Sequence, residues 1–113
     1  MKYMLLIYRD EAAFQAPKPG GGPSAPYLAY SKALEDAAVR LDGARLQPTA
    51  SASTVRIRSG KTEILDGPYA ETREQLAGYY VIDVPDLDAA LDWAARCPAA
   101  EQGMIEVRPL VEA

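Results

Sequence analysis

The sequence predicts one α+β domain over residues 1–113, with an antiparallel sheet and two helices on one face of that sheet. The length of 113 residues is that of a single domain, and it suffices to bury a core without a metal or a disulfide. Strand-like and helix-like segments follow one another as β-α-β, a β-hairpin, and β-α-β. This order is the split βαβ, or ferredoxin-like, arrangement with a hairpin inserted between its halves.

Residues 1–8 (MKYMLLIY) predict the first strand. Every position from Tyr3 to Tyr8 is apolar or aromatic, whereas a half-buried strand alternates between apolar and polar side chains. An uninterrupted run indicates that both faces of the strand are covered. The strand ends where charged residues begin, at Arg9.

Residues 14–26 predict a loop, because they contain four prolines and three glycines. We expect this loop to be mobile and to act as a flap over a pocket.

The sequence then predicts a helix that begins at Ser24 or Pro26 and runs to about Leu41, where the following Asp-Gly pair is its C-terminal stop. Spacings of three and four residues predict its buried face, which carries Tyr27, Ser31, Leu34, Ala38 and Leu41.

The middle of the chain predicts a short strand and a β-hairpin. Residues 44–47 are the short strand, which a proline ends. Residues 51–58 alternate in polarity, and residues 61–65 return as the partner strand. Ser59 and Gly60 form the two-residue turn between them.

The last third of the chain predicts a strand, a helix and a strand. Residues 77–84 form a strand that is again apolar on both faces. Asp86 caps a helix over residues 87–96, and residues 104–108 alternate as the final strand. The spacing predicts a buried stripe of Leu87, Ala90, Leu91 and Ala94 on this helix.

The two strands that are apolar on both faces predict a homodimer. Two helices can cover only one face of the sheet, and the sequence offers no further element for the other. A second copy that packs sheet against sheet is the economical cover. Burying the extra tyrosines and aliphatic residues would stabilise the assembly by about 1.5–3 kcal/mol per side chain.

Composition argues against several classes of protein. The net charge is −4 and no basic stripe is visible, which argues against nucleic acid as a partner. No apolar run could span a bilayer and no signal peptide is recognisable, so we expect a cytoplasmic protein without a membrane partner. Cys97 is the only cysteine, which suits a reducing compartment and a structural thiol. Histidine, the commonest acid–base residue and zinc ligand, is absent, so we expect no metal and no cofactor.

Residues 66–80 (DGPYAETREQLAGYY) resemble the DGPF branch of the YCII-related family, which is named for an Asp-Gly-Pro-Phe run. The resemblance extends over nearly the whole chain. The other stretches that carry it are residues 1–8, 46–48, 54–56 and 105–109.

This resemblance implies a dimeric α+β barrel and no settled activity. Relatives with the same barrel include muconolactone isomerases and a dehydrochlorinase that acts on chlorinated aromatic diols. The YCII branch is thought to use a histidine–aspartate pair, with the histidine at the start of the first helix. Tyr27 stands at the matching helix start here, so a mechanism that needs the imidazole does not carry over.

The loop after the predicted hairpin gathers candidate catalytic residues. Asp66 is either a turn aspartate that bonds the backbone or a general base, and Glu71 would move a proton. Arg73 would hold an anionic group through its planar guanidinium. The alternative interpretation of this loop is a solvated turn with weak local ion pairs. The candidate ligand-binding residues are Arg73, Tyr69, Tyr8, Arg9 and Tyr27.

Two functions are compatible with these residues. The first is a cofactor-free enzyme of the isomerase or lyase type that acts on a small anionic or enol substrate. The alternative is a non-catalytic module that binds a small ligand or regulates a partner. A third interpretation is a degenerate barrel that is kept only for assembly.

Overall fold

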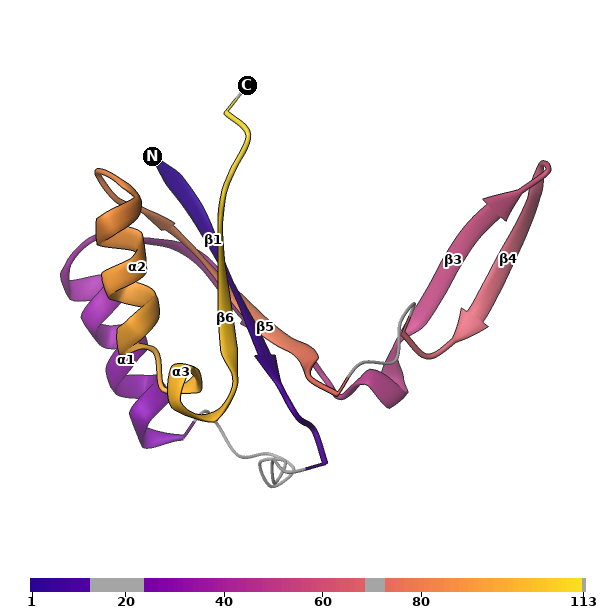
Figure 1. Ribbon diagram of the computed structural model, residues 1–113, viewed down its shortest axis with the longest axis horizontal. Helices are drawn as coiled ribbons and strands as arrows, with labels where there is room; N and C mark the ends of the chain where they lie inside the picture. The colour runs from indigo at the N-terminus through magenta and orange to yellow at the C-terminus, as the bar shows by residue number, and fades with distance from the viewer. Residues whose placement is uncertain (13–23, 69–72, 113) are drawn as a thin grey trace.

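The computed structural model describes residues 1–12, 24–68 and 73–112. Its main sheet has four strands, β1 (Lys2–Arg9), β2 (Arg40–Arg45), β5 (Gln75–Asp83) and β6 (Met104–Pro109), in the order β2-β5-β1-β6. Each pair of neighbouring strands is antiparallel. Helices α1 (Ala25–Asp36) and α2 (Leu87–Arg96) lie on the same face of this sheet, and a short helix α3 (Ala99–Gln102) leads into β6 (Figure 1). The predicted ferredoxin-like α+β fold is therefore confirmed, whereas the predicted flap lies, over residues 14–23, outside the described residues.

The core lies between the sheet and the helices. Tyr3, Leu5 and Ile7 alternate along β1 and are all buried beneath the helices. The Tyr30 hydroxyl donates a hydrogen bond of 2.6 Å to the carbonyl oxygen of Trp93, which ties α1 to α2. The other large buried side chains of the core are Leu34, Tyr80, Ile82 and Val84.

The opposite face of the sheet, called here the open face, explains the uninterrupted apolar run of β1. Met4, Leu6 and Tyr8 alternate with the buried residues and are half-buried. No helix of the described ranges packs on this face (Figure 1). Neighbouring strands add Tyr79, Val81 and Met104 to it.

Helix α1 ends five residues earlier than the sequence predicts, and β2 begins earlier as a result. Ala38 adopts a left-handed conformation with φ of 59°. Its N–H donates to the Glu35 carbonyl oxygen at 2.9 Å, and the Val39 N–H donates to that of Leu34 at 3.1 Å. This pair of bonds is a Schellman cap, for which glycine is the usual left-handed residue. Because alanine occupies the position here, the sequence pattern did not reveal the helix end.

The predicted hairpin is confirmed and forms a separate two-stranded sheet. Strands β3 (Ser53–Arg58) and β4 (Lys61–Asp66) pair with each other and project away from the main sheet (Figure 1). The turn residues Ser59 and Gly60 both have positive φ, of 48° and 77°, as a tight hairpin turn of this kind requires.

The root of the hairpin is bonded to the end of β1. A short 3₁₀ helix η1 (Thr49–Ser51) precedes β3. The Glu11 carboxylate accepts hydrogen bonds of 2.8 Å from both the backbone N–H and the hydroxyl of Thr49. The Gly67 N–H also donates to the carbonyl oxygen of Ala52 at 2.6 Å. These bonds fix where the hairpin leaves the domain.

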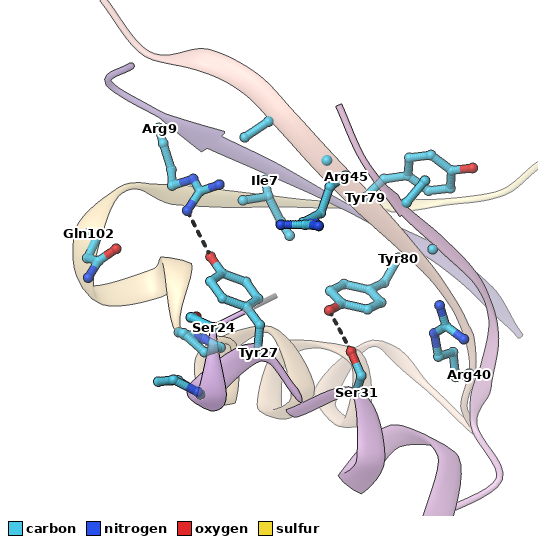
Figure 2. A pocket seen from close by; sticks show the side chains of 16 residues that line it. Ile7, Arg9, Ser24, Tyr27, Ser31, Arg40, Arg45, Tyr79, Tyr80 and Gln102 are labelled. Atoms are coloured by element: carbon cyan, nitrogen blue, oxygen red, sulfur yellow. Dashed lines mark hydrogen bonds between the residues drawn. The ribbon is translucent and has the colours of Figure 1, made fainter. Parts of the chain in front are cut away.

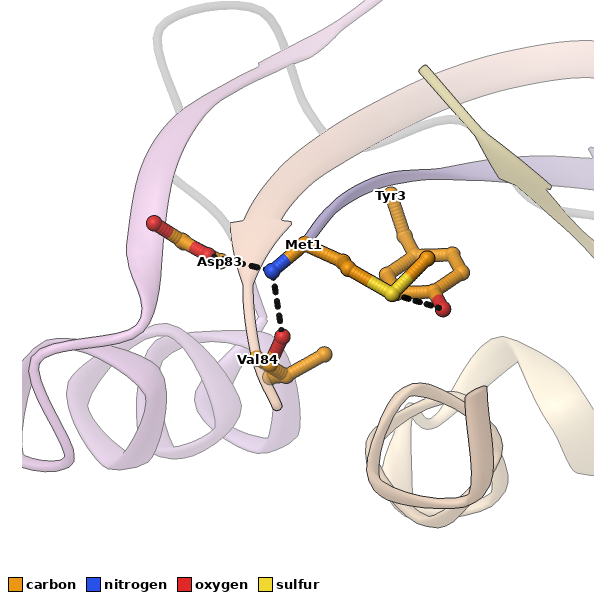
Figure 3. Close-up of polar contacts among 4 residues, drawn as sticks. All are labelled: Met1, Tyr3, Asp83 and Val84. Carbon is orange, nitrogen blue, oxygen red and sulfur yellow. Dashed lines mark hydrogen bonds and ion pairs between the residues drawn. The ribbon is translucent and has the colours of Figure 1, made fainter. Parts of the chain in front are cut away.

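Two further contacts close the domain at its other end. The Met1 ammonium group pairs with the Asp83 carboxylate at 3.1 Å and donates to the Val84 carbonyl oxygen at 2.8 Å (Figure 3). The Asp86 carboxylate accepts from the Ala89 N–H at 2.9 Å, which confirms the predicted cap of α2.

None of the helices in the described ranges is long and apolar enough to cross a membrane.

The alanine substitution Leu34→Ala tests how α1 packs. Leu34 is fully buried, so its truncation should lower the free energy of unfolding by about 2–5 kcal/mol. Leu28 lies on the same helix and is 56% exposed, so Leu28→Ala should change it by only about 0.5 kcal/mol. Urea denaturation followed by circular dichroism measures both variants, and equal losses would contradict this orientation of the helix.

Candidate functional site

A cavity of about 660 Å³ opens between α1 and the sheet. Its volume lies within the range of small-molecule sites. Strands β1, β2 and β5, helix α1, and the segment around α3 all contribute to its wall (Figure 2). The cavity is therefore on the covered face of the sheet, opposite to the open face.

The pleat of the strands directs three arginines toward this cavity. Arg9 follows Ile7 by two residues on β1, so it shares the covered face. On β2, Arg40 and Arg45 pair with Ile82 and Gly78, which are buried residues of β5. All three arginines line the cavity.

At one end of the cavity Arg9 and Tyr27 contact each other. The Arg9 Nη1 group donates to the Tyr27 hydroxyl over 3.5 Å, and the guanidinium carbon lies 5.6 Å from the ring centroid (Figure 2). Burial raises the pKa of Tyr27 above its ordinary value of 10.0, although the nearby Arg9 charge opposes the shift. Tyr27 is thus a neutral hydroxyl at neutral pH, and it keeps a proton to donate.

Farther along the cavity Arg40 and Tyr80 form a second group. The hydroxyls of Ser31 and Tyr80 are hydrogen-bonded at 3.0 Å, and the Arg40 guanidinium lies 6.0 Å from the Tyr80 ring centroid (Figure 2). Arg40 Nη1 also donates to the Glu35 carboxylate at 3.4 Å. Its Nε, which is buried, has no hydrogen-bond partner among the described residues.

The charge of the cavity wall is opposite to that of the chain. The described residues that line it include three arginines and no carboxylate, although the net charge of the chain is −4. Arginine side chains stay cationic in proteins. The wall thus favours an anion.

The described residues include no group of three histidine, cysteine, aspartate or glutamate residues that could hold a metal ion.

Two of the residues predicted from sequence lie together in this cavity, and the other predicted residues that the structure describes do not. Arg9 and Tyr27 line it, whereas Tyr8 belongs to the open face. Asp66 ends β4, at the root of the projecting hairpin, and Arg73 is 92% exposed with its Nε 3.8 Å from the Asp10 carboxylate. Neither of these two lines the cavity. Tyr69 and Glu71 lie outside the described residues, so the catalytic role of this loop stays a prediction.

Sequence reasoning missed most of the cavity wall. Arg40 falls outside the buried face of the helix predicted to run to about Leu41, and the helix in fact ends before it at Asp36. Arg45 belongs to a short strand whose pattern indicates no site. The one available signal was Ser31, a hydroxyl on the otherwise apolar face predicted for α1. It bonds Tyr80 inside the cavity.

Comparison with known proteins gives a family and no activity. The YCII-related domain matches the chain over residues 1–113. An uncharacterised protein of Rhizobium meliloti (strain 1021) is 40% identical over 114 residues, which covers 97% of this chain and 92% of the relative. Both findings agree with the resemblance seen in the sequence, and the chain belongs to the YCII-related domain family.

Proposed function

We propose that this protein binds a small organic anion in the cavity between α1 and the sheet. The observation that carries the proposal is the gathering of three arginines on a wall whose described residues include no carboxylate. Charge-assisted hydrogen bonds from a guanidinium to a carboxylate are stronger than neutral ones. The cavity volume of about 660 Å³ suits a ligand of metabolite size.

The end of the cavity at Arg9 is suited to a carboxylate. Arg9 offers a planar fork of donors, and the Tyr27 hydroxyl beside it offers one more. The apolar body of the ligand would lie against the rings of Tyr27 and Tyr80 and the side chain of Ile7, which line the same cavity. The proposed ligand is therefore amphipathic, with an anionic group and an apolar or aromatic body.

These residues favour binding over proton-transfer catalysis. A general acid or base works best when its pKa lies near the operating pH. Histidine is absent from the chain, the described lining residues include no carboxylate, and burial moves the pKa of Tyr27 further from neutrality. Of the two functions compatible with the sequence, the ligand-binding module therefore has the better support.

The variant Arg9→Gln tests this site. It removes the charge beside Tyr27, so the affinity for benzoate, a carboxylate on an aromatic ring, should fall at least about tenfold, or ~1.4 kcal/mol. Isothermal titration calorimetry measures the loss. A dissociation constant that does not change on this substitution would rule out the Arg9 end as the anion site.

Two matched variants serve as controls for Arg9→Gln. Arg56→Gln removes an arginine from the projecting hairpin, where it pairs with Glu63 at 2.7 Å, and it should leave binding unchanged. Arg73→Gln separates the two candidate sites. If Arg73→Gln loses benzoate binding and Arg9→Gln does not, the ligand binds at the loop predicted from sequence.

The affinity for benzoate should be constant between pH 6 and pH 9. The described lining residues include no histidine or carboxylate, and benzoate itself remains ionised across this range because its carboxyl pKa is about 4. Above pH 10, ionisation of Tyr27 would remove a donor and add a like charge, so affinity should fall there. Calorimetry over this pH range is the measurement, and a transition centred between pH 6 and pH 8 would reveal a titrating group in the site.

We also propose that two copies of the chain pair through the open face. The half-buried side chains of β1 there, Met4, Leu6 and Tyr8, support this proposal, because isolated apolar strips of this kind mark interfaces. Tyr79 and Val81 of β5 extend the same strip. A twofold axis would place the strip of one copy against that of the other.

Static light scattering at micromolar concentration tests this pairing. The parent protein should have the mass of two chains, and Leu6→Asp should have the mass of one, because an aspartate there would be buried without a partner. Leu28→Asp makes the same chemical change on the exposed side of α1 and should leave the dimer intact. A single-chain mass for the parent would refute the proposal.

A further inference from the structure

Arg9 and Arg40 lie at different positions along the strand direction of the sheet. Arg9 pairs with Gln75 at one end of β5, whereas Arg40 pairs with Ile82 near the other end, and Ile82 in turn faces Tyr3. Arg40 is therefore aligned with Tyr3 of β1, and Arg9 follows Tyr3 by six residues on that strand. At about 3.3 Å per residue, the backbones of Arg9 and Arg40 stand about 20 Å apart along the strand direction. Their side chains nevertheless line one cavity.

Each of these arginines has its own aromatic and hydroxyl neighbours. Arg9 contacts the ring and the hydroxyl of Tyr27. Arg40 lies over Tyr80, whose hydroxyl bonds Ser31. In Figure 2 the Arg9–Tyr27 pair is on one side of the cavity and the Arg40–Tyr80 pair is on the other, with Arg45 between them. The three cations are therefore spread along the cavity, with Arg9 and Arg40 at its two ends.

The Arg40 end has unused capacity to bind an anion. The buried Nε of Arg40 has no hydrogen-bond partner among the described residues. Its contact with Glu35 is 3.4 Å long, and the Glu35 side chain is 60% exposed, so solvent weakens this pair. A buried donor without a partner is unfavourable by about 1–3 kcal/mol. A ligand anion that reached this nitrogen would remove that penalty.

From these observations we infer that the ligand carries two anionic groups, one bound at Arg9 and one at Arg40. Between the ends, the wall carries the tyrosine rings and Ile7 beside Arg45, and an aromatic spacer can pack against both the rings and a guanidinium. The ligand class is therefore a dicarboxylate, or a carboxylate joined to a second anionic group such as an enolate, with the two charges at opposite ends. This inference rests on the proposed function and names its substrate class.

A graded series of acids tests the inference on the parent protein. Titration calorimetry compares straight-chain dicarboxylates from succinate to suberate with the monocarboxylates of equal carbon number, and terephthalate with benzoate. At least one dicarboxylate should bind ten times more tightly than its monocarboxylate partner, and the advantage should peak at one spacing of the two carboxylates. Monocarboxylates that bind as tightly as every dicarboxylate would overturn the inference and leave the proposed function standing. Failure of both kinds of acid to bind would overturn the proposed function itself.

The variant Arg40→Gln then identifies the second end. It should abolish the advantage of the dicarboxylate, and it should lower monocarboxylate affinity by a much smaller factor than dicarboxylate affinity. An equal loss for both kinds of acid would mean a single anion site and would overturn the inference. Arg40→Lys keeps the charge and removes the Nε donor, so it should retain part of the advantage. Arg56→Gln on the hairpin should change neither class of affinity.

Discussion

The alternation of side chains along β1 is the constraint on which the rest of the structure depends. The strand lies between β5 and β6 in the sheet, so both of its edges are hydrogen-bonded and only its faces are available to side chains. One set of alternating residues, Tyr3, Leu5 and Ile7, is buried beneath the helices, and Arg9 continues that set beyond the core. A shift of one residue in the register would exchange the two faces. Thus the same alternation that forms the core also turns an arginine toward the cavity.

Small residues of β2 and β5 line the cavity beneath α1. Gly43, Ala44, Ala77 and Gly78 all belong to its wall. A Cβ added at Gly78 would stand 2.7 Å from the Ala44 carbonyl oxygen, so the strands approach too closely there for a larger residue. Long side chains from neighbouring positions then reach across the space that these residues leave.

The sequence predicted the order of the elements and one half of the site. The uninterrupted apolar run of β1, the alternation of β6, the Ser59-Gly60 turn and the Asp86 cap are local patterns, and local patterns are visible in one sequence. The end of α1 was not visible, because Ala38 occupies a left-handed position where glycine is usual. That single error placed Arg40 on a helix and hid its role. Arg9 and Tyr27 were found because both stand at the ends of well-marked elements, whereas Arg45 and Tyr80 join them only through tertiary packing.

The gathering of three arginines on one wall is not explained by the stability of the fold. Like charges repel, and a buried Nε without a partner on Arg40 is unfavourable in the free protein. Replacing such groups with apolar residues of similar volume is often neutral or favourable for stability. The packing supplied by Tyr30 and Leu34 does not require them, because both are buried independently against the sheet. A donor that is unfavourable in the empty protein and that an anion would satisfy, such as the Arg40 Nε, is what a binding site requires. A ligand that bonds this nitrogen would therefore bind the folded state selectively and raise its stability.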